Sequence, residues 1–226
     1  GQARIDGFTI SGSKAGGGIH VACGVGALVI RNNEITGNQG GYAGGIAAGI
    51  RDEGDPNIAN ANLVVRGNHI HKNGGTQGAG GIMLYSFNAG YLVEDNRIEG
   101  NFSRFNGGGI AHVGECAGDN VIRNNEVLFN EDFFGAVLNG AGDGGGIFVG
   151  SVTLIDRATG QPIPATGSGN VTIEGNLIQG NLSGSGHGGG IRADGVNGQD
   201  VAENPDNTDP RPPPETDPPN WYELKI

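Results

Sequence analysis

The chain has 226 residues, 47 of them glycine, and carries a formal net charge of −11. Glycine at about three times its ordinary frequency disfavours a helical bundle, and the absence of a G-X-Y period excludes collagen. The acidic balance opposes binding to nucleic acid, and it would repel polyanionic sugars unless cations bound with them. Because no 18-residue apolar run is present, membrane insertion is not expected.

Two short patterns alternate along the chain and begin within its first forty residues. A Gly-Gly-Ile step that ends at Ile19 marks the entry to a strand. An apolar run at residues 28–30 predicts a second strand. An Asn-x-Ile turn at Asn33 follows it, with a further asparagine, Asn38, five residues later.

The same marks recur in the same order through the rest of the chain. Further Gly-Gly-Ile steps end at Ile46, Ile82, Ile110, Ile147 and Ile191. Further asparagine pairs are Asn68 and Asn73, Asn96 and Asn101, Asn125 and Asn130, and Asn176 and Asn181. Apolar runs precede them at residues 63–65, 91–93, 121–122 and 171–173. Successive steps lie 27, 36, 28, 37 and 44 residues apart, which indicates constant strands separated by loops of varying length.

These marks predict an all-β solenoid of about six coils. No stretch keeps a 3.6-residue period, so strands are favoured over helices, and parallel stacking places each strand about 4.8 Å from its copy. The glycine pair avoids Cβ clashes at the entry to a strand. Asparagine tolerates the left-handed backbone angles of a tight turn, and its stacked side chains can hydrogen-bond along a ladder.

Charged residues around the turns also fall into columns. Two residues before each turn asparagine stand Arg31, Arg66, Glu94, Arg123 and Glu174, and one residue after it stand Glu34, His69, Arg97, Glu126 and Leu177. The signs mostly alternate between adjacent coils, so cross-strand neighbours should stabilise one another by about 0.2–1 kcal/mol each.

Residues 5–10, 31–38 and 107–110 resemble the parallel β-helix repeats of the pectate-lyase-like superfamily, as found in large bacterial surface and secreted proteins. The resemblance covers roughly residues 3–195. It implies a right-handed parallel β-helix with irregular loop insertions, and an extracellular or cell-surface location. It does not specify a reaction, because the superfamily includes lyases, hydrolases, epimerases, adhesins and proteins with no known reaction.

We expect a single β-helix domain over residues 1–226, cut from a longer solenoid, because no amphipathic helix covers either end. Residues 195–220 are an acidic, proline-rich loop insertion, after which strand-like alternation resumes. Cys23 and Cys116 follow the first and fourth Gly-Gly-Ile steps. Three coil rises separate them by about 14 Å, too far for a disulfide, so two free thiols are predicted.

In this superfamily, enzymes usually act in the groove beside the Gly-Gly-Ile strands. Outward positions there include Arg192 and Asp194, which are candidates for base and acid in lyase or hydrolase chemistry. Glu115 is a second candidate carboxylate, two coils or roughly 10 Å from Asp194. The candidates for carbohydrate contact are Tyr85, Phe148 and His20.

Metal-binding signals in the sequence are weak. Asp52, Glu53 and Asp55 could bind Ca²⁺ from one loop, but they lack the spacing of a known calcium motif, so no cofactor is assigned. His69 and His71 are expected to share one outward face, and two histidines alone do not define a metal site. His112 is expected to be a hydrogen-bonded structural histidine, and His187 to belong to a glycine-rich turn.

Two functions remain open at this stage. The first is a non-catalytic scaffold or adhesion module, whose partners are polysaccharides, other surface proteins or the rest of its own parent chain. The alternative is a carbohydrate-active enzyme, either a polysaccharide lyase or a glycoside hydrolase. An enzyme should show acids and bases that converge in the groove, whereas a scaffold should show ladders and scattered loops.

Overall fold

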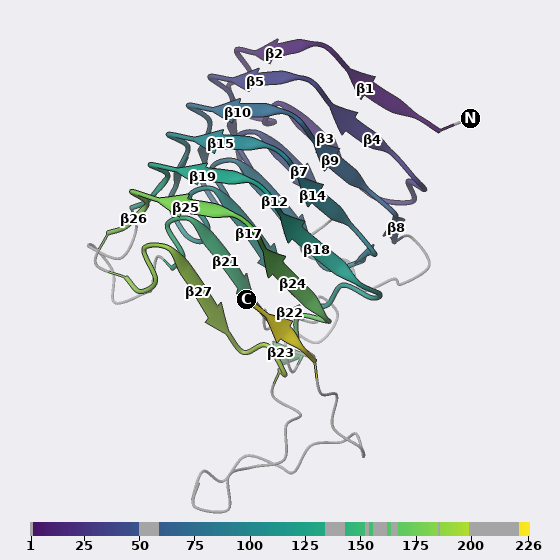
Figure 1. The fold of residues 1–226 in the computed structure, drawn as a ribbon, viewed down its shortest axis with the longest axis vertical. Helices are drawn as coiled ribbons and strands as arrows, with labels where there is room; N and C mark the ends of the chain where they lie inside the picture. The colour runs from purple at the N-terminus through teal and green to yellow at the C-terminus, as the bar shows by residue number, and fades with distance from the viewer. Residues whose placement is uncertain are drawn as a thin grey trace, which may run out of the picture.

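The computed structural model describes residues 2–49, 59–133, 143–151, 154–155, 162–163, 167–184, 186–198 and 222–226. Within these ranges the chain forms four parallel sheets whose strands come from successive coils (Figure 1). No described segment forms a helix long and apolar enough to cross a membrane.

Each sheet runs along the stack, with one strand from each coil. Sheet A contains β1 (Arg4–Asp6), β4 (Val29–Arg31), β9 (Val64–Arg66), β14 (Leu92–Glu94), β18 (Asn120–Arg123), β24 (Val171–Glu174) and β28 (Leu224–Lys225). Sheet B contains β2 (Thr9–Ser11), β5 (Glu34–Thr36), β10 (His69–His71), β15 (Arg97–Glu99), β19 (Glu126–Leu128) and β25 (Leu177–Gln179). Sheet C contains β6 (Gln39–Gly40), β11 (Gly74–Gly75), β16 (Phe102–Ser103), β20 (Glu131–Asp132) and β26 (Leu182–Ser183). Sheet D contains β3 (Ile19–Val21), β7 (Ile46–Ala48), β12 (Ile82–Tyr85), β17 (Ile110–Val113), β21 (Ile147–Gly150) and β27 (Ile191–Asp194).

Two short pairings lie outside these sheets. Strands β8 (Asn60–Ala61) and β13 (Asn88–Ala89) pair in parallel, and β22 (Leu154–Ile155) pairs antiparallel with β23 (Pro162–Ile163).

The register confirms the predicted parallel β-helix and its number of coils. The isoleucines of the Gly-Gly-Ile steps pair directly across sheet D, from Ile19 through to Ile191. Sheets B and D each contain six strands. The uneven spacing of the marks is therefore absorbed between strands and leaves the stacking unchanged.

The core lies inside the stack, where every coil contributes apolar side chains. Fully buried members of this core are Ile30, Ile35, Ile46, Ile70, Ile82, Ile98, Ile110, Ile122 and Ile147. Each such side chain contributes about 1.5–3 kcal/mol by its removal from water. The side-chain period of two then sends the alternate residues of every strand outward.

The asparagine pairs form two continuous ladders inside the turns. In one ladder the Asn68 side-chain amide donates to Asn96 Oδ1 at 3.0 Å, and Asn96 donates to Asn125 Oδ1 at 2.9 Å. The prediction of hydrogen-bonded asparagine ladders is confirmed. The prediction that the ladder asparagines themselves adopt the left-handed backbone conformation is wrong by one position. The residue before each of them adopts it, as in Asp95 (φ 55°) and Asn124 (φ 53°). The ladder asparagine can therefore point inward with its amide fully bonded.

The glycine pairs are needed because adjacent coils approach closely. A Cβ added to Gly109 would lie 2.7 Å from the Gly146 carbonyl oxygen and 2.8 Å from Val127 Cγ1. Backbone on the next coil cannot move aside without separating the strands, which is the physical reason for this part of the repeat.

Both cysteines are free, as the coil separation predicted. Strands β3 and β17, which precede Cys23 and Cys116, are three steps apart in sheet D. Cys116 is fully buried, and its Sγ lies 3.3 Å from the Tyr85 carbonyl oxygen.

His112 is a structural core residue, as predicted. It is 0% exposed, with Nε2 2.8 Å from the Ser168 carbonyl oxygen and Nδ1 2.8 Å from the Tyr91 hydroxyl. Because a carbonyl only accepts, Nε2 carries the proton and Nδ1 accepts from Tyr91. Burial lowers the pKa of His112 to about 4, so the neutral ring is favoured.

Candidate functional site

The outer face of sheet D, where catalysis was considered, is filled by apolar side chains along the middle of the stack. Ala47, Met83, Ala111 and Phe148 occupy one outward column in direct register and are at most 5% exposed. They form a second apolar cluster, with Ala43, Ala79 and Tyr42 from the segments that precede β7 and β12. The open groove expected beside these strands is therefore closed in this part of the described chain.

Of the three candidates for carbohydrate contact, two are buried and one is exposed. Tyr85 is 2% exposed and Phe148 5% exposed, so neither offers the open ring face that stacking on a sugar requires. His20 is exposed at the first strand of sheet D, with its ring 5.9 Å from that of Tyr42.

A cavity of about 450 Å³ remains over the same face. It is lined by Thr76, Gln77, Met83, Tyr85, Arg104, Phe105, Asn106 and Val113. Arg104 is the single charged side chain among these lining residues, and none of them is a carboxylate or a histidine. The cavity thus lacks the paired acids that glycoside hydrolysis uses.

The candidate base Arg192 lies among carboxylates on the last strand of sheet D. Its Nη2 is 3.1 Å from Asp194 Oδ2 and 3.8 Å from Oδ2 of Asp143, a buried residue that is 4% exposed. Asp143 also accepts a 3.1 Å hydrogen bond from the His187 backbone, which fixes the glycine-rich turn to which His187 was assigned. Both carboxylates occupy this guanidinium, whereas a catalytic base must be free to accept a proton from the substrate.

The carboxylates of Glu115 and Asp194, the two acidic candidates, bond to different partners. Glu115 Oε1 accepts a 2.9 Å hydrogen bond from the Tyr222 hydroxyl, so its carboxylate faces the strand β28 region, whereas that of Asp194 faces Arg192. Asp52, Glu53 and Asp55, named for Ca²⁺, lie outside the described residues, as does most of the 195–220 insertion.

Further ion pairs between adjacent coils lie on the outer faces of sheets A and B. On sheet A, Arg31 pairs with Asp6 at 2.7 Å and Arg123 with Glu94 at 2.8 Å, each across one coil step. The Arg123–Glu94 pair confirms the predicted alternation of sign, and Asp6 extends the column by one strand. Both pairs are partly exposed, so each adds little to the stability of the stack.

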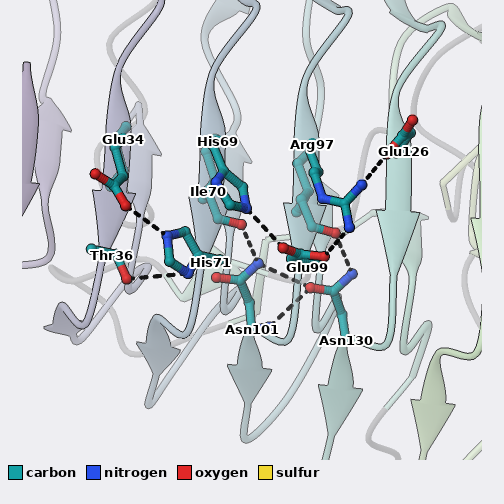
Figure 2. A network of polar contacts seen from close by, with 12 residues as sticks. Glu34, Thr36, His69, Ile70, His71, Arg97, Glu99, Asn101, Glu126 and Asn130 are labelled. Carbon is teal, nitrogen blue, oxygen red and sulfur yellow. Dashed lines mark hydrogen bonds and ion pairs between the residues drawn. The ribbon is translucent and has the colours of Figure 1, made fainter.

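Sheet B carries a longer network across strands β5, β10, β15 and β19, which are adjacent in the sheet (Figure 2). Arg97 sits between two carboxylates, with Nη2 2.7 Å from Glu99 Oε2 and Nη1 2.7 Å from Glu126 Oε2. Glu99 Oε1 in turn lies 2.8 Å from His69 Nε2. Hydrogen bonding from Arg97, assisted by His69, holds the pKa of Glu99 at about 2, so this carboxylate is ionised at neutral pH.

The two histidines of β10 project from the same face, as predicted, and their rings stack at 4.1 Å with an interplanar angle of 18°. Glu34 on the neighbouring strand completes a cluster with them, its Oε1 3.3 Å from His71 Nε2. One ligand atom from each of Glu34, His69 and His71 lies within 4.8 Å of the others. Thr36 Oγ1 is 3.3 Å from the other ring nitrogen of His71.

The sequence contained the signal for this cluster, although the pair of histidines was first judged insufficient. Glu34 and His69 fall in one predicted column, and register places them directly opposite each other. A histidine two residues along the strand then lies on the same face as both. Column position and the strand period of two are thus sufficient to predict a three-residue group.

Comparison with known proteins gives a family and no individual relative. The family model described as a right-handed β-helix region matches residues 1–181. No curated protein matches the chain, and no solved structure does.

Proposed function

The chain belongs to the right-handed β-helix family, and from that premise we propose that it is a non-catalytic scaffold or adhesion module of a secreted or cell-surface protein. The observation that carries this proposal is the apolar filling of the outer face of sheet D. Four outward positions in successive coils are closed to solvent, and Arg104 is the one charged side chain among the described residues that line the cavity beside them. Ladders stabilise the rest of the stack and make it a rigid support for surface contacts.

The contacts of an adhesion module would come from exposed side chains on the outside of the stack. Phe102 on β16 is 38% exposed and Phe133, just after β20, is 52% exposed, with ring centroids 5.8 Å apart. Exposed aromatic rings offer planar faces for the C–H surface of pyranose sugars. Carbohydrate is therefore the partner we assign to this pair of rings.

Incubation with neutral and acidic polysaccharides, with and without Ca²⁺, tests the proposal. We expect retention of a polysaccharide without new reducing ends or unsaturated products. Phe133→Ala should weaken retention, whereas Phe8→Ala, which removes a 59% exposed ring from the turn between β1 and β2, should leave it unchanged. Cleavage that is abolished by Asp194→Ala or Arg192→Ala would overturn the non-catalytic proposal in favour of an enzyme.

A further inference from the structure

We propose that Glu34, His69 and His71 bind one divalent transition-metal ion, of the Zn²⁺ type, on the outer face of sheet B. The three side chains come from two adjacent strands whose register is fixed by the ladder, with Glu34 opposite His69. Their ligand atoms lie within 4.8 Å of one another. The site is independent of the function proposed above and concerns a different face of the stack.

The spacing of one pair, His71 and Glu34, already suits a metal. Zn²⁺ binds nitrogen and oxygen at about 2.1 Å, and tetrahedral angles then place two ligand atoms about 3.4 Å apart. His71 Nε2 and Glu34 Oε1 are 3.3 Å apart. The widest separation in the group must shorten by at most about 1.4 Å, which rotation of the partly exposed side chains of His69 and Glu34 (40% and 47% exposed) can supply.

A neighbouring oxygen bonds to one nitrogen of each ring, as around bound metals, and the stacked rings must tilt apart for one ion to lie in the plane of both. Metal-ligating histidines usually direct their second ring nitrogen to a carboxylate or another oxygen. Here Thr36 Oγ1 meets His71 Nδ1, and Glu99 Oε1 meets His69 Nε2 at 2.8 Å. Arg97 holds Glu99 in place (Figure 2), so Nε2 of His71 and Nδ1 of His69 are the nitrogens left for an ion.

The ligand set selects the class of ion. Two imidazoles and one carboxylate suit Zn²⁺, Co²⁺, Ni²⁺ or Cu²⁺, whereas Ca²⁺ and Mg²⁺ require mainly oxygen ligands. Three protein ligands leave at least one coordination position for water or for a donor group of a partner. The opposing interpretation is a surface ladder in which His71–Glu34 and His69–Glu99 are only hydrogen-bonded pairs.

Isothermal titration of the metal-free chain with Zn²⁺, and separately with Ca²⁺, distinguishes the two interpretations. We expect one equivalent of Zn²⁺ to bind and Ca²⁺ to give no comparable heat. His71→Ala and His69→Ala should each weaken Zn²⁺ binding at least tenfold, and Glu99→Gln, a positioning change, about 10–100-fold. The matched control is His187→Ala, which removes a 70% exposed histidine from the turn before β27 and should leave the affinity unchanged.

Two further measurements keep the test decisive. Co²⁺ absorption in the visible range should show nitrogen and oxygen ligation in the wild-type chain and lose intensity in His71→Ala. Glu34→Gln keeps the size of a half-exposed side chain on the outer face of sheet B and removes its charge, so weaker binding in a variant that stays folded reports on the ligand itself. Absence of Zn²⁺ binding, or binding that is equal in wild type, His69→Ala and His71→Ala, would overturn the proposal.

Discussion

Removal of a single ladder asparagine should destabilise the whole stack. The Asn101 side chain donates to the Ile70 carbonyl oxygen at 2.9 Å and to Asn130 Oδ1 at 2.9 Å (Figure 2). Its Oδ1 also accepts from the Asn73 backbone N–H and side-chain amide, at 3.1 Å and 3.0 Å. Four hydrogen bonds at about 1 kcal/mol each make Asn101→Ala about 4 kcal/mol less stable, since the buried Asn73 N–H also loses its partner.

Urea denaturation followed by circular dichroism measures this loss as a change in the free energy of unfolding. Gln39→Ala is the control, because it removes an exposed side chain from strand β6, two coil steps away in sheet C, and should change stability by no more than about 0.5 kcal/mol. If Asn101→Ala cost less than about 1 kcal/mol, the asparagine ladder would not contribute as described.

Three further predictions follow from the interior of the stack. Burial lowers the pKa of His112 to about 4, so between about pH 6.5 and pH 4 the unfolded chain binds a proton that the folded chain does not bind. The free energy of unfolding should therefore fall by about 3 kcal/mol as the pH drops through this range. Urea titrations across this range should show a smaller fall for His112→Gln, and an equal fall would contradict the assignment. Gly109→Ala should lower the free energy of unfolding by about 1–3 kcal/mol, because the added Cβ meets backbone on the next coil. Gly74→Ala should not lower it, because no atom lies within 4 Å of the added Cβ. Equal losses of stability in the two variants would refute the close approach of the coils at Gly109. Cys23 should react with a thiol reagent in the folded chain, while Cys116 should react only after denaturation. Cys116 is fully buried, and burial raises the pKa of its thiol to about 12. Rapid labelling of both cysteines in the folded chain would refute this placement.

The stacking of the coils could be predicted from sequence because its causes recur in every coil. Gly109 and its equivalents allow close approach, and Asn101 and its equivalents bond to the coils on either side. Both requirements are local and repeat with the backbone, so they leave a pattern that survives insertions of any length. The free state of Cys23 and Cys116 follows from the same register.

The closed face of sheet D could not be predicted in the same way. Its cover includes Tyr42, Ala43 and Ala79, which belong to connecting segments outside the repeat. The path of such segments depends on packing particular to each coil, so outward positions such as Phe148 looked accessible from strand periodicity alone. Asp143 could not be predicted for a related reason, since it lies outside both repeat patterns and reaches Arg192 only through tertiary contact.

The distance between spin labels at two outward positions of sheet B tests the stacked register most directly. Thr9 on β2 and Leu177 on β25 occupy one column and are separated by five coil steps. Spin labels are attached to cysteines at these two positions in a chain that carries Cys23→Ser and keeps the inaccessible Cys116. Pulsed electron paramagnetic resonance should then give a mean separation of about 24 Å. A separation near half or twice that value would mean that the asparagine and glycine marks do not stack coil on coil.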